Sequence, residues 1–275
     1  MRHSFTSSRV LLTGASSGIG EALAIELAKE GADLVLLARR EGRLKNVVEQ
    51  IHSLQNFRKE QIIETVVGDM TDASVRQRAI DVAAERLGGI DYLINNAGVG
   101  ATSLMELTSE ETLRRLFEVN FFALVDLTKR SLPFLKDSAK QTDRLKLGIR
   151  PMIVNLSSIV GLRGVPHYGA YGAAKFAVAG LSESWRAELA REGIELLLVC
   201  PGTTKTEFFD VLLQSGTSPT MPVHQEVTAE YVATRIVKAM KKGKHKIIPY
   251  FQAKILDLLN RFVPGFVDSI MVKYV

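Results

Sequence analysis

Residues 13–20 read Thr13-Gly14-Ala15-Ser16-Ser17-Gly18-Ile19-Gly20 and separate a short apolar run, residues 10–12, from a segment with helical periodicity, residues 21–30. A tight turn that brings the backbone close to a pyrophosphate leaves no room for a Cβ, which explains the glycines. The start of the following helix would offer free N–H groups and a partial positive charge to the phosphates. We therefore predict a strand, a phosphate-binding turn and a helix, rather than an ordinary glycine turn.

Strands and helices alternate along the rest of the chain. Further buried strands are expected at residues 34–37, 62–67, 90–94, 152–156 and 194–199, and helices at residues 42–54, 73–87, 109–135 and 168–191. Parallel strands need crossover connections, and helices of this length supply them. No linker rich in Pro, Gly or Ser divides the 275 residues, so we predict a single dinucleotide-binding catalytic domain over residues 1–275. The fold class expected is α/β, a doubly wound parallel sheet with helices on both faces.

The end of the second strand bears on the choice of cofactor. An enzyme that uses NAD carries an acidic residue there, which binds the ribose 2′-hydroxyl. This chain has Ala38, followed by Arg39 and Arg40. A guanidinium binds a 2′-phosphate through charge-assisted hydrogen bonds, whereas a carboxylate repels it. We therefore expect NADP(H), bound by Arg39 and Arg40 with Ser16 as a further donor. The alternative is that both arginines are solvated surface residues.

Two smaller groups follow the third and fourth strands. Asp69 is placed to accept a hydrogen bond from an adenine amino group, and Met70 to cap the ring. Asn96, Ala97 and Gly98 offer small side chains and an amide where the backbone would approach the cofactor. Each group alone is a weak signal, because turns rich in Asn and Gly are common.

A second constellation lies in the helix expected at residues 168–191. Tyr171 and Lys175 are one turn apart and share a face of that helix. A tyrosine pKa of about 10 is too high for acid–base work at neutral pH, but a nearby ammonium lowers it. Tyr171 would then exchange a proton with a carbonyl oxygen while a hydride is transferred. Ser157 and Ser158, at the end of the fifth strand, offer hydroxyls that can bind the same oxygen.

Together these motifs resemble the classical short-chain dehydrogenase/reductase family. The matching elements are Thr13-Gly14-x-x-x-Gly18-Ile19-Gly20, Asn95-Asn96-Ala97-Gly98, Asn120, Ser158, Tyr171-x-x-x-Lys175 and Pro201-Gly202, in the family's order over about residues 8–206. The resemblance implies a Rossmann-type sheet of about seven strands. It also implies a homodimer or homotetramer formed through the helices around Asn120 and Tyr171.

The resemblance further implies roles for individual residues. Tyr171 matches the catalytic acid/base, and Lys175 matches the lysine that lowers the tyrosine pKa and binds the nicotinamide ribose. Ser158, and not Ser157, matches the substrate-orienting serine, and Asn120 matches the asparagine that holds a proton-relay water. Thr206 matches the threonine that contacts the nicotinamide carboxamide, and Ala38-Arg39 matches the pattern that prefers NADP. The cofactor-binding residues expected are Gly14, Ser16, Ser17, Gly18, Ile19, Gly20, Arg39, Arg40, Asp69, Met70, Asn96, Ala97, Gly98, Tyr171, Lys175, Pro201, Gly202, Thr204 and Thr206.

These residues predict an NADP(H)-dependent oxidoreductase that moves a hydride between nicotinamide and a carbonyl or secondary alcohol. The main alternative is a non-catalytic dinucleotide sensor on the same fold. It is disfavoured because Asn120, Ser158, Tyr171 and Lys175 are all present. A sugar-nucleotide epimerase on a related fold is disfavoured by the glycine spacing and by a chain that is short for an extra substrate domain.

Composition argues against several other classes. The net charge is +5, but the basic residues are scattered, and their densest cluster, residues 241–246, has no interleaved aromatics. We therefore expect no nucleic-acid partner. Cys200 is the one cysteine of the sequence, which excludes an intrachain disulfide and favours a cytoplasmic location. No metal is expected, since His167 has no second ligand in sight, and no apolar run is long enough to span a bilayer.

Three segments lie outside this pattern. The basic stretch at residues 137–150 is expected to be surface decoration. Residues 205–227 are expected to form a lid, in which Phe208 and Leu212 indicate an apolar or lipid-like ketone or aldehyde as substrate. Residues 252–275 form an apolar helical extension, interrupted at Pro264. Two interpretations of this extension stay open: packing on the fold or a partner subunit, and peripheral membrane contact assisted by the cluster at residues 241–246.

Overall fold

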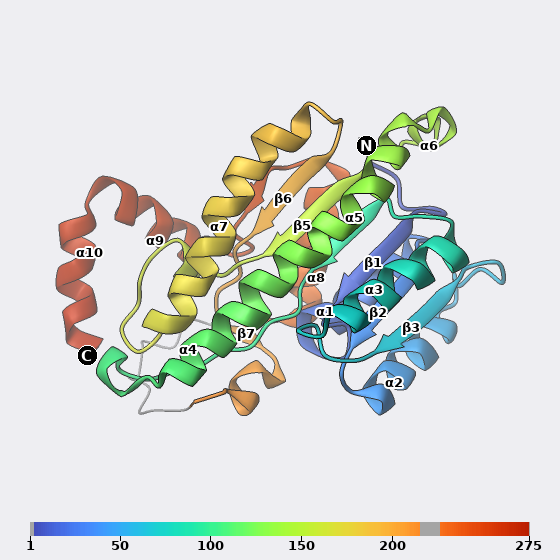
Figure 1. The fold of residues 1–275 in the computed structure, drawn as a ribbon. Helices are drawn as coiled ribbons and strands as arrows, with labels where there is room; N and C mark the ends of the chain where they lie inside the picture. The colour runs from blue at the N-terminus through green and yellow to red at the C-terminus, as the bar shows by residue number, and fades with distance from the viewer. Residues whose placement is uncertain (1–2, 215–225, 275) are drawn as a thin grey trace.

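A parallel sheet lies between two layers of helices in the computed structural model, which describes residues 3–214 and 226–274 (Figure 1). Its strands are β1 (Arg9–Thr13), β2 (Asp33–Ala38), β3 (Ile63–Val67), β4 (Tyr92–Asn95), β5 (Met152–Leu156), β6 (Glu195–Val199) and β9 (Lys246–Ile247). Within the described residues these seven strands follow the order β3-β2-β1-β4-β5-β6-β9. The strand order reverses between β1 and β4, which is the point where such sheets bind ligands. The predicted Rossmann-type doubly wound sheet is therefore confirmed.

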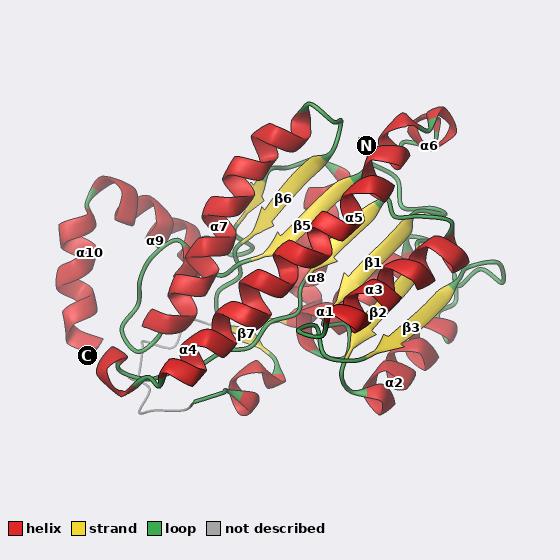
Figure 2. Cartoon of the chain, in the orientation of Figure 1, coloured by secondary structure: helices red, strands yellow, loops and turns green. Residues whose placement is uncertain are grey.

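The helices divide between the two faces of the sheet (Figure 2). The helices that pack on the sheet are α1 (Gly18–Lys29), α2 (Glu41–His52), α3 (Ala73–Val82), α5 (Ala123–Lys140), α7 (Gly169–Ala190) and α8 (Ala229–Lys241). Helices α1, α2 and α8 share one core with the sheet, and α3, α5 and α7 share the other. Both faces of the sheet are therefore dry, which is why its strands read as continuous apolar runs.

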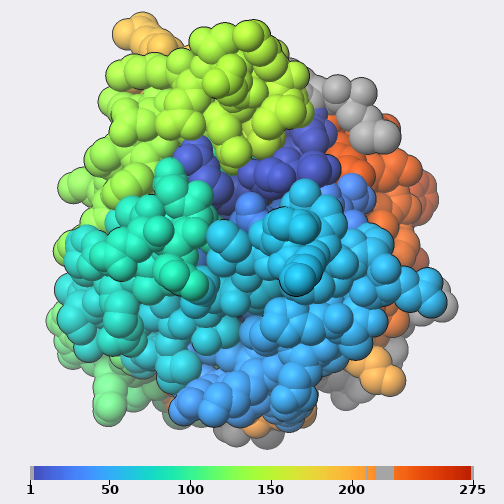
Figure 3. All heavy atoms as spheres, turned by 90° about the vertical axis from the view of Figure 1, so that its right-hand side faces the viewer, coloured from blue at the N-terminus to red at the C-terminus, as the bar shows by residue number. Residues whose placement is uncertain are grey.

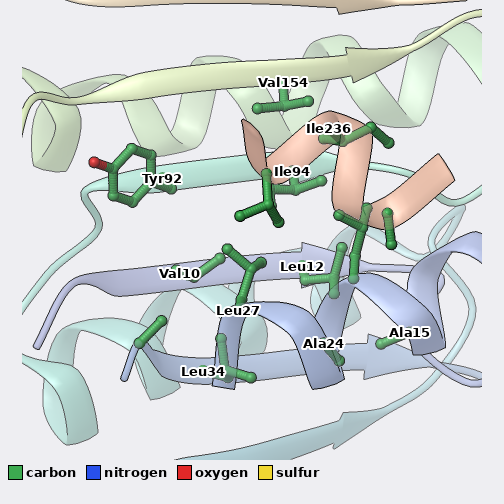
Figure 4. Packing of buried hydrophobic residues seen from close by; sticks show 14 of the residues in the cluster. Val10, Leu12, Ala15, Ala24, Leu27, Leu34, Tyr92, Ile94, Val154 and Ile236 are labelled. Carbon is green, nitrogen blue, oxygen red and sulfur yellow. The ribbon is translucent and has the colours of Figure 1, made fainter. Parts of the chain in front are cut away.

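Alternation along the strands assigns neighbouring residues to opposite cores. Leu12 and Ile94 point toward Leu27 of α1 and Ile236 of α8 (Figure 4), whereas Leu11 faces the other core. All five side chains are fully buried. Each such side chain contributes about 1.5–3 kcal/mol through removal from water. This packing fixes the position of α1 relative to the end of β1, where the glycine-rich turn lies.

The helix expected at residues 109–135 is built in three parts. Helix α4 (Glu110–Phe117) passes into a π-helical turn, η3 (Glu118–Phe122), and then into α5. Such turns carry an extra residue and frequently occur at functional sites. Here the turn contains Asn120, which is 1% exposed. Apolar periodicity predicted one continuous helix here and did not predict this interruption.

The basic stretch at residues 137–150 is largely exposed, as expected, but it is more than surface decoration, since Ser138 and Ile149 are buried and Arg144 reaches a buried carboxylate. Helix α5 continues through its first residues, α6 (Thr142–Lys146) follows, and this segment lies against the start of the chain (Figure 3). Asp91, which is fully buried before β4, accepts hydrogen bonds from Arg9 and Ser138, both at 2.7 Å, and from Arg144. Although burial raises it, these partners hold the pKa of Asp91 below its ordinary value. The stretch therefore braces the edge of the sheet opposite the glycine-rich turn.

The glycine-rich turn after β1 is locked by the end of β4. The backbone N–H groups of Asn96 and Ala97 both donate to Thr13 Oγ1 at 3.0 Å, and Asn96 Nδ2 donates to the carbonyls of Thr13 and Gly14. Helix α1 then rests directly on this turn, because a Cβ placed on Gly20 would lie 2.1 Å from the carbonyl oxygen of Gly14. Only glycine fits at that position.

We predict that Gly20→Ala destabilises the fold by roughly 2–3 kcal/mol, because the added methyl forces α1 away from a backbone carbonyl that cannot yield. Urea unfolding measures the effect. Gly42→Ala is the matched control, since Gly42 lies in α2 and an added Cβ there meets nothing within 4 Å. We expect it to be neutral or stabilising by up to about 1 kcal/mol. Equal effects of the two substitutions would contradict the close approach at Gly20.

Candidate active site

The residues singled out in the sequence fall mainly at one edge of the sheet. All strands of the described sheet are parallel, so their carboxyl ends meet at that edge. The segments that leave these ends are residues 14–20 after β1, 39–40 after β2, 68–70 after β3, 96–98 after β4, 157–158 after β5 and 201–206 after β6. Asn120 and Tyr171 reach the same edge from η3 and α7.

The start of α1 fits the pyrophosphate of a dinucleotide. Ser17 is its N-cap residue, and the Ser17 side chain makes no capping hydrogen bond, so the first N–H groups are left for a ligand. Gly14 and Gly18 have positive φ angles of 67° and 56°, a backbone conformation that favours glycine. Ser16 is buried beside them, and Ile19 packs on the core below. The donor set therefore suits an anionic cofactor.

Two arginines that follow β2, Arg40 and Arg43, form ion pairs with Glu207, a residue that the sequence did not single out. Arg40 Nη1 lies 2.8 Å from Glu207 Oε2, and Arg43 Nη2 lies 2.7 Å from Glu207 Oε1. Hydrogen bonding and charge from these arginines hold the pKa of the Glu207 carboxyl below its ordinary value. Arg39 is exposed at the end of β2. One carboxylate thus bridges two guanidinium groups, an arrangement that a phosphate could also satisfy.

Two of the residues expected to bind adenine have other contacts here. Asp69 accepts hydrogen bonds from Thr71 at 2.9 Å and from Arg115 at 2.7 Å. Although partial burial raises it, these bonds keep the pKa of Asp69 below its ordinary value. The side chain of Met70 is 7% exposed and packs in the core with Val75, which leaves little of it to cap a ring. The Asp69 carboxylate is therefore charged and oriented, whereas the role expected for Met70 has no support in its packing.

Tyr171 and the serine pair meet between β5 and α7. The Ser157 hydroxyl is buried and donates to the backbone carbonyl of Lys175 at 2.8 Å, which ties the strand to the helix. Ser158 instead hydrogen-bonds Tyr171, and its hydroxyl also donates to the carbonyl of Pro201 at 3.3 Å. Of the two hydroxyls, the one from Ser158 is therefore placed beside the phenol.

Lys175 and Asn120 converge at the backbone of Gly98. A Cβ placed there would lie 2.7 Å from Asn120 Oδ1 and 3.4 Å from Lys175 Nζ. Asn120 is fixed by the backbone of Val99, to which it donates at 2.9 Å and from which it accepts at 3.2 Å. Lys175 Nζ donates to the carbonyl of Leu156 at 3.0 Å. Both polar groups are held in place before any ligand arrives.

Burial controls the titration of the tyrosine and the lysine. Desolvation raises the pKa of Tyr171, and the hydrogen bond with Ser158 only partly opposes it. Desolvation also lowers the pKa of Lys175 to about 8. The expected lowering of the tyrosine pKa by Lys175 is therefore not found in the protein alone. The reason is geometric: Lys175 Nζ lies 5.8 Å from the centre of the Tyr171 ring and bonds a backbone carbonyl.

The described part of the expected lid covers Tyr171. The ring of Phe208 lies 5.7 Å from that of Tyr171, and a Cβ placed on Gly100 would meet both Phe208 and Leu212. Strands β7 (Thr204–Lys205) and β8 (Val227–Thr228) pair in parallel and join the two ends of the segment at residues 205–227. Residues 215–225 lie outside the described residues. An apolar roof therefore sits directly above the candidate acid.

The segment after β6 is held by Tyr250, which sequence analysis missed. A Cβ placed on Gly202 would lie 2.0 Å from the hydroxyl of Tyr250, so Pro201-Gly202 passes directly over that ring. Thr204 donates to the carbonyl of Gly202 at 3.2 Å. The Thr206 methyl reaches Gly18, since a Cβ on that glycine would lie 2.8 Å from it. Thr206 therefore lies over the glycine-rich turn. No local pattern pointed to Tyr250, because it comes 48 residues after Gly202 in the chain.

Lys175 has a pKa of about 8 in the folded protein and 10.5 in a free lysine. We therefore predict that the free energy of unfolding of the wild type, minus that of Lys175→Met, increases as pH rises from about 8 to 10.5. The folded protein then releases the buried proton while the unfolded chain still holds it, so the cost of burying a charged lysine is relieved. The full change is about 3 kcal/mol. Urea unfolding at several pH values measures it. Lys129→Met, at an exposed position of α5, is the control and should show no such trend. Parallel curves for the wild type and Lys175→Met would contradict the prediction.

The short chain dehydrogenase family matches residues 8–215. The chain is 35% identical to the 3-ketodihydrosphingosine reductase of Bacteroides thetaiotaomicron over 73% of this chain and 65% of that protein. The chain spans about 53–65% of the length of the curated relatives it matches first.

Two solved structures with bound cofactor are similar over almost the whole chain. A short chain dehydrogenase/reductase from Burkholderia phymatum in complex with NAD is 25% identical, with a TM-score of 0.81 and 94% of each chain covered. A short-chain dehydrogenase from Sphingobium yanoikuyae in complex with NADPH is 27% identical, with a TM-score of 0.75 and 95% of each chain covered. Because the family match covers most of the chain and agrees with the fold, this protein belongs to the short-chain dehydrogenase/reductase family.

Proposed function

We propose that this chain is an oxidoreductase that moves a hydride between NADP(H) and a carbonyl or secondary alcohol carbon. The observation that carries the proposal is the enclosed Tyr171 hydroxyl, which is hydrogen-bonded to Ser158 and lies one helical turn from Lys175. These groups lie at the same sheet edge as the uncapped start of α1. A phosphate-binding turn next to a partly buried tyrosine acid suits reduction of a carbonyl.

The side chains divide the proton chemistry between them. When bound, the nicotinamide supplies or accepts the hydride. Tyr171 donates its proton to the carbonyl oxygen in reduction and takes it back in oxidation, and Ser158 hydrogen-bonds the same oxygen. Burial keeps Tyr171 protonated in the protein alone, so the acid is loaded before substrate arrives. No lowering of the Tyr171 pKa by Lys175 is found in the protein alone, so Lys175, held beside Asn120 at Gly98, would favour the phenolate only with cofactor and substrate bound.

We expect Tyr171→Phe to lower kcat by about 10²–10⁴-fold, because the proton donor is lost while the ring and its packing remain. NADPH oxidation with a panel of ketones and aldehydes, read optically, measures the rate, and NADPH fluorescence measures binding, which should hardly change. Tyr168→Phe is the matched control on the preceding turn and should retain most of the rate. Equal losses in both variants would count against Tyr171 as the acid, and NADPH binding without any turnover would favour a sensor.

The choice of NADP(H) rests on the side chains after β2, since similar structures hold either cofactor. Ala38 leaves no carboxylate to repel a 2′-phosphate, and Arg39 lies exposed beside it. Arg40 and Arg43 already share one anionic partner, Glu207. A 2′-phosphate would take the place of that carboxylate, so Glu207 competes with NADPH but not with NADH.

Two substitutions test this competition in opposite directions. Arg40→Ala should weaken NADPH binding by about tenfold, the scale of one charge-assisted contact, and leave NADH binding unchanged. Glu207→Gln should tighten NADPH binding by about twofold to fivefold, in keeping with the modest strength of an exposed ion pair. Titration of both variants with both cofactors measures the four affinities. Parallel changes for NADH and NADPH would contradict the assignment.

We infer that the substrate is an apolar or lipid-like ketone or aldehyde. The roof above Tyr171 is formed by Phe208 and Leu212, and Leu213 is exposed next to them. One of the relatives is named as a 3-ketodihydrosphingosine reductase, and that name describes a lipid-like ketone. Small charged keto acids would meet no compensating charge on this roof and should be poor substrates.

We also propose a homodimer or homotetramer formed through the helices that carry the site. Phe122, in η3, is 54% exposed, and Phe176, in α7, is 43% exposed. Both lie near residues of the site, at Asn120 and Lys175. Exposed aromatics on adjacent helices favour contact with a second copy of the chain.

A further inference from the structure

The C-terminal helices present an unusual amount of apolar side chain to solvent. Helices α9 (Phe251–Phe262) and α10 (Pro264–Met271) form a pair beyond β9 (Figure 1). Of the fifteen large hydrophobic residues exposed in the described part of the chain, seven belong to this segment: Phe251, Ile255, Leu258, Phe262, Val263, Phe266 and Val272. Phe262 is 77% exposed and Val272 is 72% exposed. A patch this dense marks an interaction surface.

The opposite side of the pair is fixed to the body of the protein. Ala253 packs with Ile248 and Tyr250, and Val267 and Met271 are buried. The extension is therefore not a loose tail. Its inner side belongs to the fold, and its outer side is a separate surface.

The charged side chains of the C-terminal segment also differ in whether they are paired. Both carboxylates of α9 and α10 are paired within the protein, since Asp257 lies 3.7 Å from Lys246 and 3.2 Å from Arg261, and Asp268 pairs with Arg163. Lys254 and Lys273 are exposed, and the ion pairs found within residues 3–214 and 226–274 do not include them. The free charges of this surface are therefore cationic, and they accompany aromatic side chains.

The surface is attached to the segment that carries Ser158. Arg163, five residues later, donates to Asn260 Oδ1 at 3.0 Å as well as binding Asp268. Asn260 Nδ2 donates in turn to the carbonyl of Leu162 at 3.4 Å. Whatever binds the outer side of α9 and α10 is thus held close to the active site.

We propose that the outer side of α9 and α10 docks on an anionic lipid bilayer and holds the active site next to the membrane. Aromatic side chains with free lysines match an acidic bilayer surface, whereas the same face of a second copy would bring like charges together. None of the helices in the described residues is long and apolar enough to cross a membrane. The contact is therefore peripheral. The docking itself does not depend on the proposed function. Only the further step, in which an apolar substrate reaches the active site from the bilayer, rests on it.

Flotation with vesicles tests the docking on the full-length protein. The wild type should float with phosphatidylcholine vesicles that contain phosphatidylserine, and much less with phosphatidylcholine alone or at high salt. Phe262→Asp combined with Phe266→Asp should reduce the partition coefficient by at least about tenfold, because two rings no longer leave water. Lys254→Glu combined with Lys273→Glu should also reduce it. Leu147→Asp, at an exposed apolar residue beyond α6, is the matched control and should float like the wild type.

Two further measurements separate the outcomes. Turnover of a water-soluble carbonyl should be unchanged in these variants, which would show that they are folded. If the wild type shows no such turnover, that result counts against the proposed function and not against the docking. Sedimentation in the absence of vesicles reports the oligomeric state. Failure of the wild type to float, variants that float as well as it does, or a dimer that the Phe262/Phe266 variant dissociates would each overturn the proposal.

Discussion

The contact on which the site depends is the approach of α1 to the end of β1, where Gly20 faces the carbonyl of Gly14 with no side chain between them. Asn96 makes the same turn rigid from the other side by donating to the carbonyls of Thr13 and Gly14. A helix start held so close to a strand end directs its free N–H groups at one point. Because residues at the end of β4 make these hydrogen bonds, the glycine-rich turn and the Asn96–Gly98 segment cannot move independently.

The second constraint is the desolvation of two neighbouring ionisable groups, the partly buried Tyr171 and the buried Lys175. Desolvation favours the neutral forms of both Tyr171 and Lys175, so the protein alone opposes the charge separation that proton transfer requires. The polar groups that could relieve this cost, from Ser158 and Asn120, are already fixed by backbone contacts. Under the proposed function, these fixed groups would act as preorganised dipoles for the charge that develops once cofactor and substrate are bound.

Sequence patterns were informative wherever the cause was local. Apolar runs and glycine spacing identified the first six strands in chain order and the turn after β1, because burial on both faces and the exclusion of a Cβ leave direct traces in the sequence. The π-helical turn at Asn120 left no such trace. Contacts between distant segments were also invisible: Glu207 with Arg40, Tyr250 with Gly202, and Arg144 with Asp91 each join residues that only the fold brings together. The sequence does not distinguish a solvated arginine from one that pairs with a buried carboxylate, because both appear in it only as a positive charge.

Three consecutive residues after β7 connect the parts of the site. Thr206 lies against Gly18 at the start of α1, Glu207 bridges Arg40 and Arg43, and Phe208 packs on Tyr171. The three side chains leave one short stretch of backbone, so a shift of that backbone would change the contacts over the glycine-rich turn, at the arginine pair and over the phenol together.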